Sequence, residues 1–314
     1  MNNDTLQATV GNVLANAIDA VSPHLFLVQA GDRRASGIVF DHTADATRIV
    51  TSSRLFHRND GAPVSIRTAS GATYTAALVG FDEATELALV LVPGPLAIST
   101  DAPALSWIEA GAVRVGQFVA PVARTEHGPH TTLGVISAVG PAWVTGLGGS
   151  VDAHLDVDGN LPAGFSGGPL IDFEGRVLGI NTRGLVAGGA TLPTATVRRV
   201  VAALARGETA RPAHLGVAIR AIEIPGNLPE ATRGLLVTHV ASGSPAAHAG
   251  IVAGDAIVAI DDTVTHDHAH LLAALAGKNG AVVKVKVVRG PRIVELEARP
   301  VARAEARRGH GCGR

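Results

Sequence analysis

Short apolar runs rich in valine, isoleucine and leucine recur between residues 24 and 190, and they constrain the fold more than any other feature of the sequence. Gly, Pro, Asp or Ser residues separate them at short intervals, and no long helical pattern intervenes. The runs are LFLVQA, SGIVF, TRIVTS, VSIRT, YTAALVGF, LALVLV, FVAPVA, TTLGVISAV and GRVLGINT. Runs of this length bounded by turn-forming residues predict β-strands, and their number predicts an all-β barrel or sandwich.

A second β-rich segment follows a helical segment, which predicts two domains. Apolar residues at helical spacing predict a first helix over 6–20, which Ser22-Pro23 ends. Further helices are expected at 194–206, 245–250 and 266–277, and further strands at 214–224, 234–241, 255–261 and 282–289. We therefore expect a mainly β protein with a first domain over 1–206, a linker over 207–212, a β-rich module with two helices over 213–302 and a disordered basic tail over 303–314.

Composition limits the classes of partner and the compartment. The 314 residues carry a formal net charge of −1, so no overall field draws the protein to nucleic acid or to an anionic membrane. The single cysteine, Cys312, excludes an intrachain disulfide. The first 20 residues lack a basic start and an unbroken apolar run, and no stretch of 18 apolar residues occurs elsewhere. The sequence as written predicts a cytoplasmic protein, and a periplasmic or secreted one if the start site is misassigned.

The sharpest motif is Gly-Phe-Ser-Gly-Gly-Pro-Leu at residues 164–170. A nucleophilic serine in acyl transfer needs a backbone that places two N–H groups around the developing oxyanion. Glycines beside the serine allow such a tight loop. The motif therefore indicates Ser166 as a nucleophile, with the N–H groups of Gly164 and Ser166 as oxyanion donors. The alternative is a glycine-rich hairpin turn.

This loop resembles the G-N-S-G-G-P-L loop of trypsin-like serine proteases, especially those of the HtrA/Deg family, with Phe165 in place of the usual Asn. The resemblance extends to ASGIVF, LVGFDEATELALVLV, VRVGQFVAPVA and TTLGVISAVG. It implies a trypsin-like double β-barrel for the first domain, in which the catalytic residues follow the order His, Asp and Ser along the chain.

Two of the three triad positions implied by the resemblance are changed. The stretch Thr-Ser-Ser-Arg-Leu-Phe at 51–56 matches the family's T-N-x-H-V-V, which puts Arg54 at the histidine position. The stretch Thr-Glu-Leu-Ala-Leu at 85–89 matches T-D-L-A-V, which puts Glu86 at the aspartate position. Arginine is protonated at any accessible pH, so Arg54 cannot act as a general base. Loss of the base costs about a million-fold in turnover in a comparable hydrolase.

Two alternatives stay open at this point. His57 lies about one helical turn beyond Arg54, roughly 5 Å along a helix, which is too far to reach Ser166 without refolding. Arg54 is otherwise a solvated surface residue, with the alignment wrong by a few positions. If the alignment holds, we expect Arg54 and Glu86 to lie on adjoining barrels near Ser166, to pair, and to hold the barrels together. Asn160, six residues before Ser166, is expected at the floor of the specificity pocket, or else is an ordinary loop residue.

The C-terminal module resembles PDZ domains as permuted in the same family. His-Leu-Gly-Val-Ala-Ile at 214–219 resembles the carboxylate-binding loop and the peptide-pairing strand, and SPAAHAGIVAGDAI resembles the segment that follows. A turn of this kind exposes successive N–H groups to a C-terminal carboxylate, and the strand edge pairs with the ligand. The residues expected to bind peptide are Leu215, Gly216, Val217 and Ile219.

No cofactor or metal site is predicted. His266 and His270 share a helix face, but no third ligand is evident, and we interpret these histidines and His268 as polar residues at a helix start. For His310 and Cys312 in the tail, the sequence likewise predicts no metal site.

The sequence favours a catalytically inactive protease homologue that binds peptide C-termini or unfolded segments, as an adaptor, a chaperone-like protein or a regulator of an active homologue. Members of the family commonly form trimers through the protease domain, but residues 1–25 lack the aromatic anchors often used there, so the sequence leaves the oligomeric state open between a homo-oligomer and a partner of an active homologue. The alternative functions are an active serine endopeptidase of protein quality control with a non-standard base, and a barrel kept only for assembly.

Overall fold

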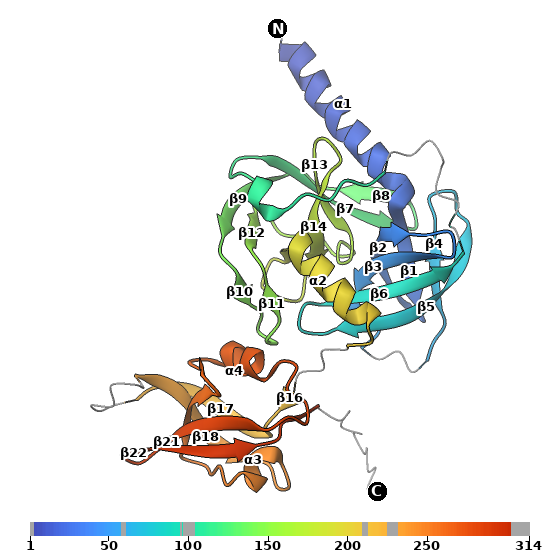
Figure 1. Ribbon diagram of the computed structural model, residues 1–314. Coiled ribbons are helices and arrows are strands. Elements are labelled where there is room, and N and C mark those ends of the chain that lie inside the picture. The colour runs from blue at the N-terminus through green and yellow to red at the C-terminus, as the bar shows by residue number, and fades with distance from the viewer. Residues whose placement is uncertain are drawn as a thin grey trace, which may run out of the picture. The chain divides into compact units, whose positions relative to one another are not determined.

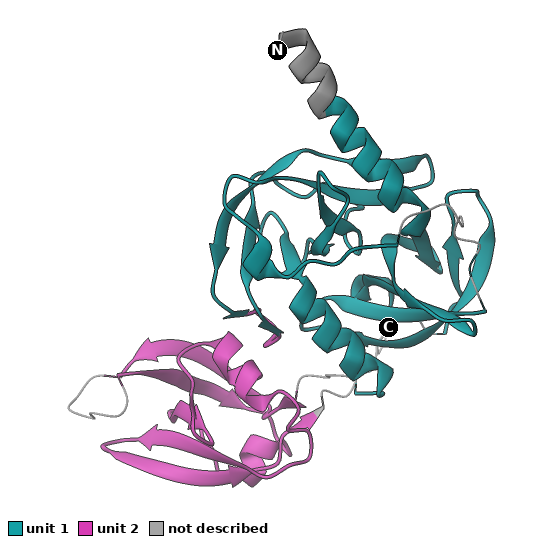
Figure 2. Ribbon diagram, turned by 45° about the horizontal axis from the view of Figure 1, so that its top comes forward, with its two compact units in different colours: residues 1–143, 150–209 teal, residues 144–149, 210–314 magenta. Residues whose placement is uncertain are grey.

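The computed structural model describes residues 3–57, 61–94, 96, 104–208, 213–224 and 232–302. It contains two compact units, one of residues 1–143 and 150–209 and one of residues 144–149 and 210–314 (Figure 2). The predicted tail, with His310 and Cys312, and most of the predicted linker lie outside the described residues.

The first unit begins with a helix, as the apolar spacing predicts. Helix α1 spans Asn3–Val21, and the 3-10 helix η1 (Ser22–His24) follows it at the serine-proline pair. Ala17 and Val21 are buried in the core of the double barrel, so the end of α1 packs on the barrels it leads into (Figure 1).

Six strands then form a closed antiparallel barrel in the order β1-β2-β3-β6-β5-β4 (Figure 1). They are β1 (Leu25–Ala30), β2 (Arg33–His42), β3 (Ala46–Ser52), β4 (Val64–Arg67), β5 (Thr73–Asp82) and β6 (Leu87–Pro93). Strand β1 pairs with both β2 and β4 and so closes the barrel. Phe26, Ile49 and Ile66 are fully buried inside it, because alternate residues of each strand face the interior.

A second sheet of seven strands follows, in the order β12-β9-β7-β13-β14-β15, with β8 paired to β7. The strands are β7 (Phe118–Thr125), β8 (Gly128–Thr131), β9 (Gly134–Gly140), β12 (His154–Val157), β13 (Pro169–Asp172), β14 (Val177–Thr182) and β15 (Ala190–Pro193). The remaining elements are η2 (Ser53–Leu55), η3 (Ala110–Ala112), the strand pair β10 (Trp143–Val144) and β11 (Ser150–Val151), and α2 (Thr194–Ala205).

One apolar cluster joins the two sheets of this unit. It combines Ile38 and Leu89 of the first barrel with Val122 and Ile180 of the second sheet, and Val197 of α2 closes it. The loops that connect strands at the edge of this shared core are therefore held in fixed positions relative to one another, which is what a site between two barrels requires.

The second unit is a sheet in the order β17-β18-β19-β21-β22, with β20 paired to β19 and a separate pair β16-β23. Its strands are β16 (Ala213–His214), β17 (Val217–Glu223), β18 (Arg233–Val240), β19 (Ala256–Ile260), β20 (Thr263–Val264), β21 (Val283–Arg289), β22 (Arg292–Ala298) and β23 (Val301–Ala302). Its helices are α3 (Pro245–His248) and α4 (His268–Leu275). The predicted fold class, a mainly β double barrel followed by a β-rich module with two helices, is confirmed. None of the described helices is long and apolar enough to cross a membrane.

Candidate active site

The loop that carries Ser166 lies so close to neighbouring backbone at Gly167 and Gly168 that a side chain would not fit at either position. Gly164 and Gly167 have positive φ angles of 90° and 83°, which favour glycine. A Cβ atom on Gly167 would lie 2.2 Å from the carbonyl oxygen of Ser36, and one on Gly168 would lie 2.0 Å from that of Val122. The glycines therefore allow the loop to lie against strands of both barrels.

Ser36 of β2 fixes this loop from the first barrel, a role that the motif search did not reveal. Its N–H donates to the carbonyl oxygen of Ser166 at 3.2 Å, and its hydroxyl donates to that of Gly164 at 3.3 Å. The same hydroxyl accepts the N–H of Arg124 at 2.8 Å. Ser36 is fully buried, so these bonds are shielded from water and tie the nucleophile loop to both sheets.

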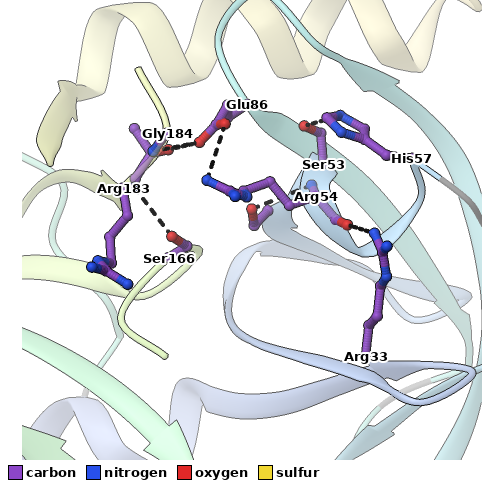
Figure 3. A network of polar contacts seen from close by, with 10 residues as sticks. Arg33, Ser53, Arg54, His57, Glu86, Ser166, Arg183 and Gly184 are labelled. Atoms are coloured by element: carbon purple, nitrogen blue, oxygen red, sulfur yellow. Dashed lines mark hydrogen bonds and ion pairs between the residues drawn. The ribbon is translucent and has the colours of Figure 1, made fainter. Parts of the chain in front are cut away.

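The hydroxyl of Ser166 has no proton acceptor in the described part of the chain. Its oxygen accepts the backbone N–H of Arg183 at 3.2 Å, and among the described residues no group accepts its proton (Figure 3). The N–H groups of Gly164 and Ser166 also have no acceptor in the part of the chain that the structure describes. In the described part of the chain, two backbone N–H groups beside Ser166 are thus open to an acceptor, while no side chain is placed to take the proton of its hydroxyl.

Arg54 lies where the alignment places it, on the same cleft as Ser166. It belongs to η2, directly after β3, where Ser52 caps the turn by accepting the N–H of Arg54 at 3.4 Å. Its carbonyl oxygen accepts a hydrogen bond from the guanidinium of Arg33 at 2.7 Å (Figure 3). The cleft that contains Arg54 and Ser166 has a volume of about 460 Å³.

Glu86 lies in the turn between β5 and β6, which Asp82 stabilises. The Asp82 carboxylate accepts the hydroxyl of Thr85 at 2.7 Å and the N–H of Ala84 at 3.0 Å, and burial raises its pKa. Glu86 itself has a φ of 58°, a left-handed conformation that costs a residue with a side chain about 1–2 kcal/mol. The turn thus holds Glu86 with its side chain directed to the second barrel.

The Glu86 carboxylate is buried and bridges the two barrels. It accepts the hydroxyl of Thr182 and the N–H of Gly184, the latter at 3.0 Å, both from the end of β14 and the loop after it (Figure 3). Arg54 pairs with it at 3.6 Å, with 54% of the arginine side chain exposed and 8% of the glutamate side chain. A Cβ atom on Gly184 would lie 1.9 Å from a carboxylate oxygen, so this glycine makes room for the acid.

The predicted pairing of Arg54 with Glu86 is therefore present, but its predicted placement on adjoining barrels is wrong. Both residues belong to the first barrel, because η2 follows β3 and the Glu86 turn precedes β6. The link between the barrels comes instead from the bonds of Glu86 to Thr182 and Gly184.

His57 faces away from Ser166. Its Nε2 atom lies 3.3 Å from the hydroxyl of Ser53 (Figure 3). The centroid of its ring lies 6.2 Å from that of the Phe81 ring. It is absent from the lining of the cleft, whereas Arg54 and Ser166 both line it. A substitute role for His57 would need the segment after β3 to refold.

Two further loop residues, Asn160 and Phe165, lie outside the lining of the cleft. Asn160 is exposed and lines a separate cavity of about 110 Å³ with Gly188, and it does not line the cleft of Ser166. The ring of Phe165 is 4% exposed and packs on Ala123 and Leu161. Phe165 therefore contributes apolar packing beneath the nucleophile loop.

In the second unit, β17 lies at the edge of its sheet, as a peptide-pairing strand must. Gly216 precedes it with a φ of 79°, and Val217 and Ile219 are half-buried. Leu215 is 2% exposed and belongs to the core, so only its backbone is placed to meet a ligand. A Cβ atom on Gly216 would lie 2.4 Å from the Cβ of Ser244, so a bulky residue there would disturb the fold as well as the carboxylate loop.

His266, His268 and His270 lie at or just before the start of α4. Asp267 caps α4 by accepting the N–H of His270 at 2.9 Å and lies 2.8 Å from its Nδ1 atom. The rings of His266 and His270 are 4.8 Å apart. Among the described residues, no three His, Cys, Asp or Glu side chains lie in a group suited to a metal ion.

Comparison with known families agrees with this geometry. A family model for the trypsin-like peptidase domain matches residues 35–180, and one for the PDZ domain matches residues 236–289. The first match contains the Ser166 loop, and the second begins after the edge strand β17. The chain is thus a trypsin-fold protein with a C-terminal PDZ domain.

Similarity to individual proteins shows which family of trypsin-fold proteins the chain belongs to. The putative serine protease HhoA of Synechocystis is 32% identical over 86% of this chain and 72% of its own length. The periplasmic pH-dependent serine endoprotease DegQ of Escherichia coli is 26% identical over 83% of this chain and 58% of its own length. The solved structure of the HtrA-type protease AlgW with a decapeptide shares the fold, with a TM-score of 0.68 and 23% identity over 93% of this chain and 99% of that one. The chain belongs to the HtrA/Deg family of serine proteases.

Proposed function

We propose that this chain is a peptide-binding member of the HtrA/Deg family whose protease site does not cleave. The observation that carries the proposal is the missing proton acceptor at Ser166. Arg54 lies on the cleft in place of a base and is permanently charged. His57, the nearest histidine in sequence, is bonded to Ser53. A nucleophile loop with its oxyanion donors remains, but a serine hydroxyl without a base is a weak nucleophile.

The binding activity is assigned to the PDZ domain. The unpaired edge of β17 supports addition of an extended peptide strand, and Leu215, Gly216, Val217 and Ile219 form the segment proposed to hold its C-terminal carboxylate. Unfolded proteins, which expose both termini and extended segments, are the proposed partners. An adaptor, chaperone-like or regulatory role follows, in a homo-oligomer or beside an active homologue.

A casein cleavage assay tests the loss of catalysis. The purified chain and Ser166→Ala should release fragments at the same background rate, because the wild-type serine has no base. A fluorophosphonate probe, which reacts with activated serines, should leave Ser166 unlabelled. Cleavage by the wild type that Ser166→Ala abolishes would refute the proposal.

The double substitution Arg54→His with Glu86→Asp tests the two replaced positions. It should permit fluorophosphonate labelling of Ser166, because the introduced imidazole would lie on the same cleft and the shorter acid would face it from the Glu86 turn. The control is the same double substitution combined with Ser166→Ala, which removes the labelled atom. Labelling of the wild-type chain equal to that of the double variant would contradict the assignment of Arg54.

The second candidate function is an active serine endopeptidase of protein quality control. The names of the relatives favour it, since they describe HhoA as a putative serine protease and DegQ as a serine endoprotease. The free N–H groups of Gly164 and Ser166 also favour it. The casein comparison separates the two functions directly.

The remaining expectations complete the proposal. We assign residues 1–206 to the peptidase-like domain and 213–302 to the PDZ domain. The cytoplasm and the periplasm are the two candidate compartments. The name of DegQ, which places that relative in the periplasm, favours the second.

A further inference from the structure

Among the described residues, those that line the cleft at Ser166 include four arginines and no acidic residue. Arg33, Arg34, Arg54 and Arg183 all contribute to its walls, with Ser166 and Gly164 beside them. All four arginines are exposed, and each guanidinium is charged at any accessible pH. The chain as a whole has a formal net charge of −1, so this positive charge is a local property of the cleft.

Neighbouring acids neutralise only half of this charge. Arg54 pairs with Glu86 at 3.6 Å and Arg34 pairs with Glu126 at 2.8 Å. For Arg33 and Arg183, no carboxylate of the described residues lies within ion-pair distance. Two guanidiniums thus face the cleft without a counter-ion from the described part of the protein.

Backbone donors lie on the same cleft. The N–H groups of Gly164 and Ser166 have no acceptor among the residues described, and the hydroxyl of Ser166 has a proton to donate. A carboxylate has two oxygens that accept several hydrogen bonds, and arginine matches it in a bidentate manner. Open N–H groups and unpaired guanidiniums in one cleft are the donor set that such an anion requires.

We propose that this cleft binds acidic peptide segments through the side-chain carboxylates of Asp or Glu. A volume of about 460 Å³ exceeds the needs of a single small anion and suits a short peptide. A nucleic acid is a poorer match, because proteins that bind it carry a basic stripe over an extended surface, whereas these four arginines line one cleft and the formal net charge of the chain is −1. With Arg54 in place of a catalytic base, the cleft then binds acidic segments without cleaving them. It is a second peptide-binding site beside the PDZ groove.

The test is fluorescence anisotropy of the full chain with a dye-labelled decapeptide that carries four glutamates. The peptide is acetylated and amidated, so it offers no terminal carboxylate to the PDZ domain. A matched peptide carries four glutamines. The glutamate peptide should bind at least tenfold more tightly at low salt, and the difference should shrink as salt screens the charges. Equal binding of the two peptides would overturn the proposal.

Variants locate the site. Arg33→Gln with Arg183→Gln should remove the tenfold preference, and Arg183→Gln alone should reduce it without touching the bond of Arg33 to the backbone. Arg114→Gln with Arg292→Gln removes the same charge from exposed positions outside the cleft and should keep the preference within twofold. An equal loss in both double variants would show a general charge effect and overturn the proposal.

A phosphoserine version of the peptide separates carboxylate from phosphate recognition. Preference for glutamate over glutamine supports the proposal whether or not the phosphopeptide also binds. Binding of the phosphopeptide alone would overturn it. The glutamate and glutamine peptides offer the same backbone and no terminal carboxylate to the PDZ domain, so their difference reports on the side chains alone. Because this binding also needs no cleavage, failure here leaves the proposed function untouched.

Discussion

Replacement of Glu86 by alanine should destabilise the double barrel by about 3 kcal/mol. The Glu86 side chain is 8% exposed and accepts hydrogen bonds from Thr182 and Gly184, and Thr182 is itself buried. Hydrogen bonds to charged groups contribute roughly 1.5–3 kcal/mol each, and loss of the acceptor leaves both donors unsatisfied. Water that enters the space of the side chain offsets part of this loss. The expected effect is therefore at the lower end of the range obtained by adding the two hydrogen bonds, about 3 kcal/mol.

Three companion variants separate the contributions. Glu86→Gln keeps the shape and an acceptor oxygen and should cost about half as much. Glu86→Gly should be about 1 kcal/mol more stable than Glu86→Ala, because φ is 58° and glycine adopts that conformation without strain. Arg54→Ala should cost under about 1 kcal/mol, since Arg54 is half exposed and its ion pair is long.

Tryptophan fluorescence during urea or thermal unfolding measures these effects in the full chain. Both tryptophans of the sequence, Trp107 and Trp143, belong to the first unit, so the signal reports on the double barrel. About 3 kcal/mol corresponds to a Tm decrease of roughly 6–12 °C for a domain of this size. If Glu86→Ala unfolds within about 0.5 kcal/mol of the wild type, Glu86 does not link the barrels and the reasoning is wrong.

Three other outcomes are expected. Gly167→Ala should destabilise the double barrel by at least about 2 kcal/mol, because its Cβ would lie 2.2 Å from the carbonyl oxygen of Ser36 and its φ is 83°; wild-type stability in urea would contradict this contact. Burial alone would raise the pKa of Asp255, but hydrogen bonds from Arg289 and from the N–H of Val252 hold it below its ordinary value of 3.8. A lowered folded-state pKa gives stability that is present above the unfolded pKa and lost as pH falls through the folded pKa. Calorimetry of the full chain should therefore show the PDZ transition weakening below about pH 4, and Asp255→Asn should remove that dependence. A peptide with a free C-terminal carboxylate and no acidic side chains should bind the chain more tightly than its amide, and equal binding would refute the carboxylate role of the loop at Gly216.

The sequence alone determined the fold class and the strand pattern of the first barrel. The run LFLVQA became β1 with the same bounds, and helix α2 was expected at 194–206 and spans Thr194–Ala205. Such runs are predictable because hydrophobic periodicity and turn-forming residues act locally. Strand β22 (Arg292–Ala298) was not predicted, since it alternates charged with apolar residues and depends on pairing with β21.

The sequence also indicated the residues of the candidate site. Ser166 in a glycine-rich loop, and Arg54 and Glu86 as the expected replacements at two triad positions, were predicted from motifs whose spacing is fixed within a few residues. These motifs predict which residues belong to the candidate site. They do not show which group each one contacts, because the partners are distant in sequence.

Only the tertiary structure decided those contacts. Ser36 lies 130 residues before Ser166 in the sequence and holds the nucleophile loop, and Gly184 makes room for a carboxylate from the other barrel. The cationic cleft arises in the same way, since Arg33, Arg54 and Arg183 come from separate segments and meet only when the barrels pack. A charge pattern along the chain averages to nearly zero, whereas the local field depends on which side chains share a surface, and packing alone fixes that.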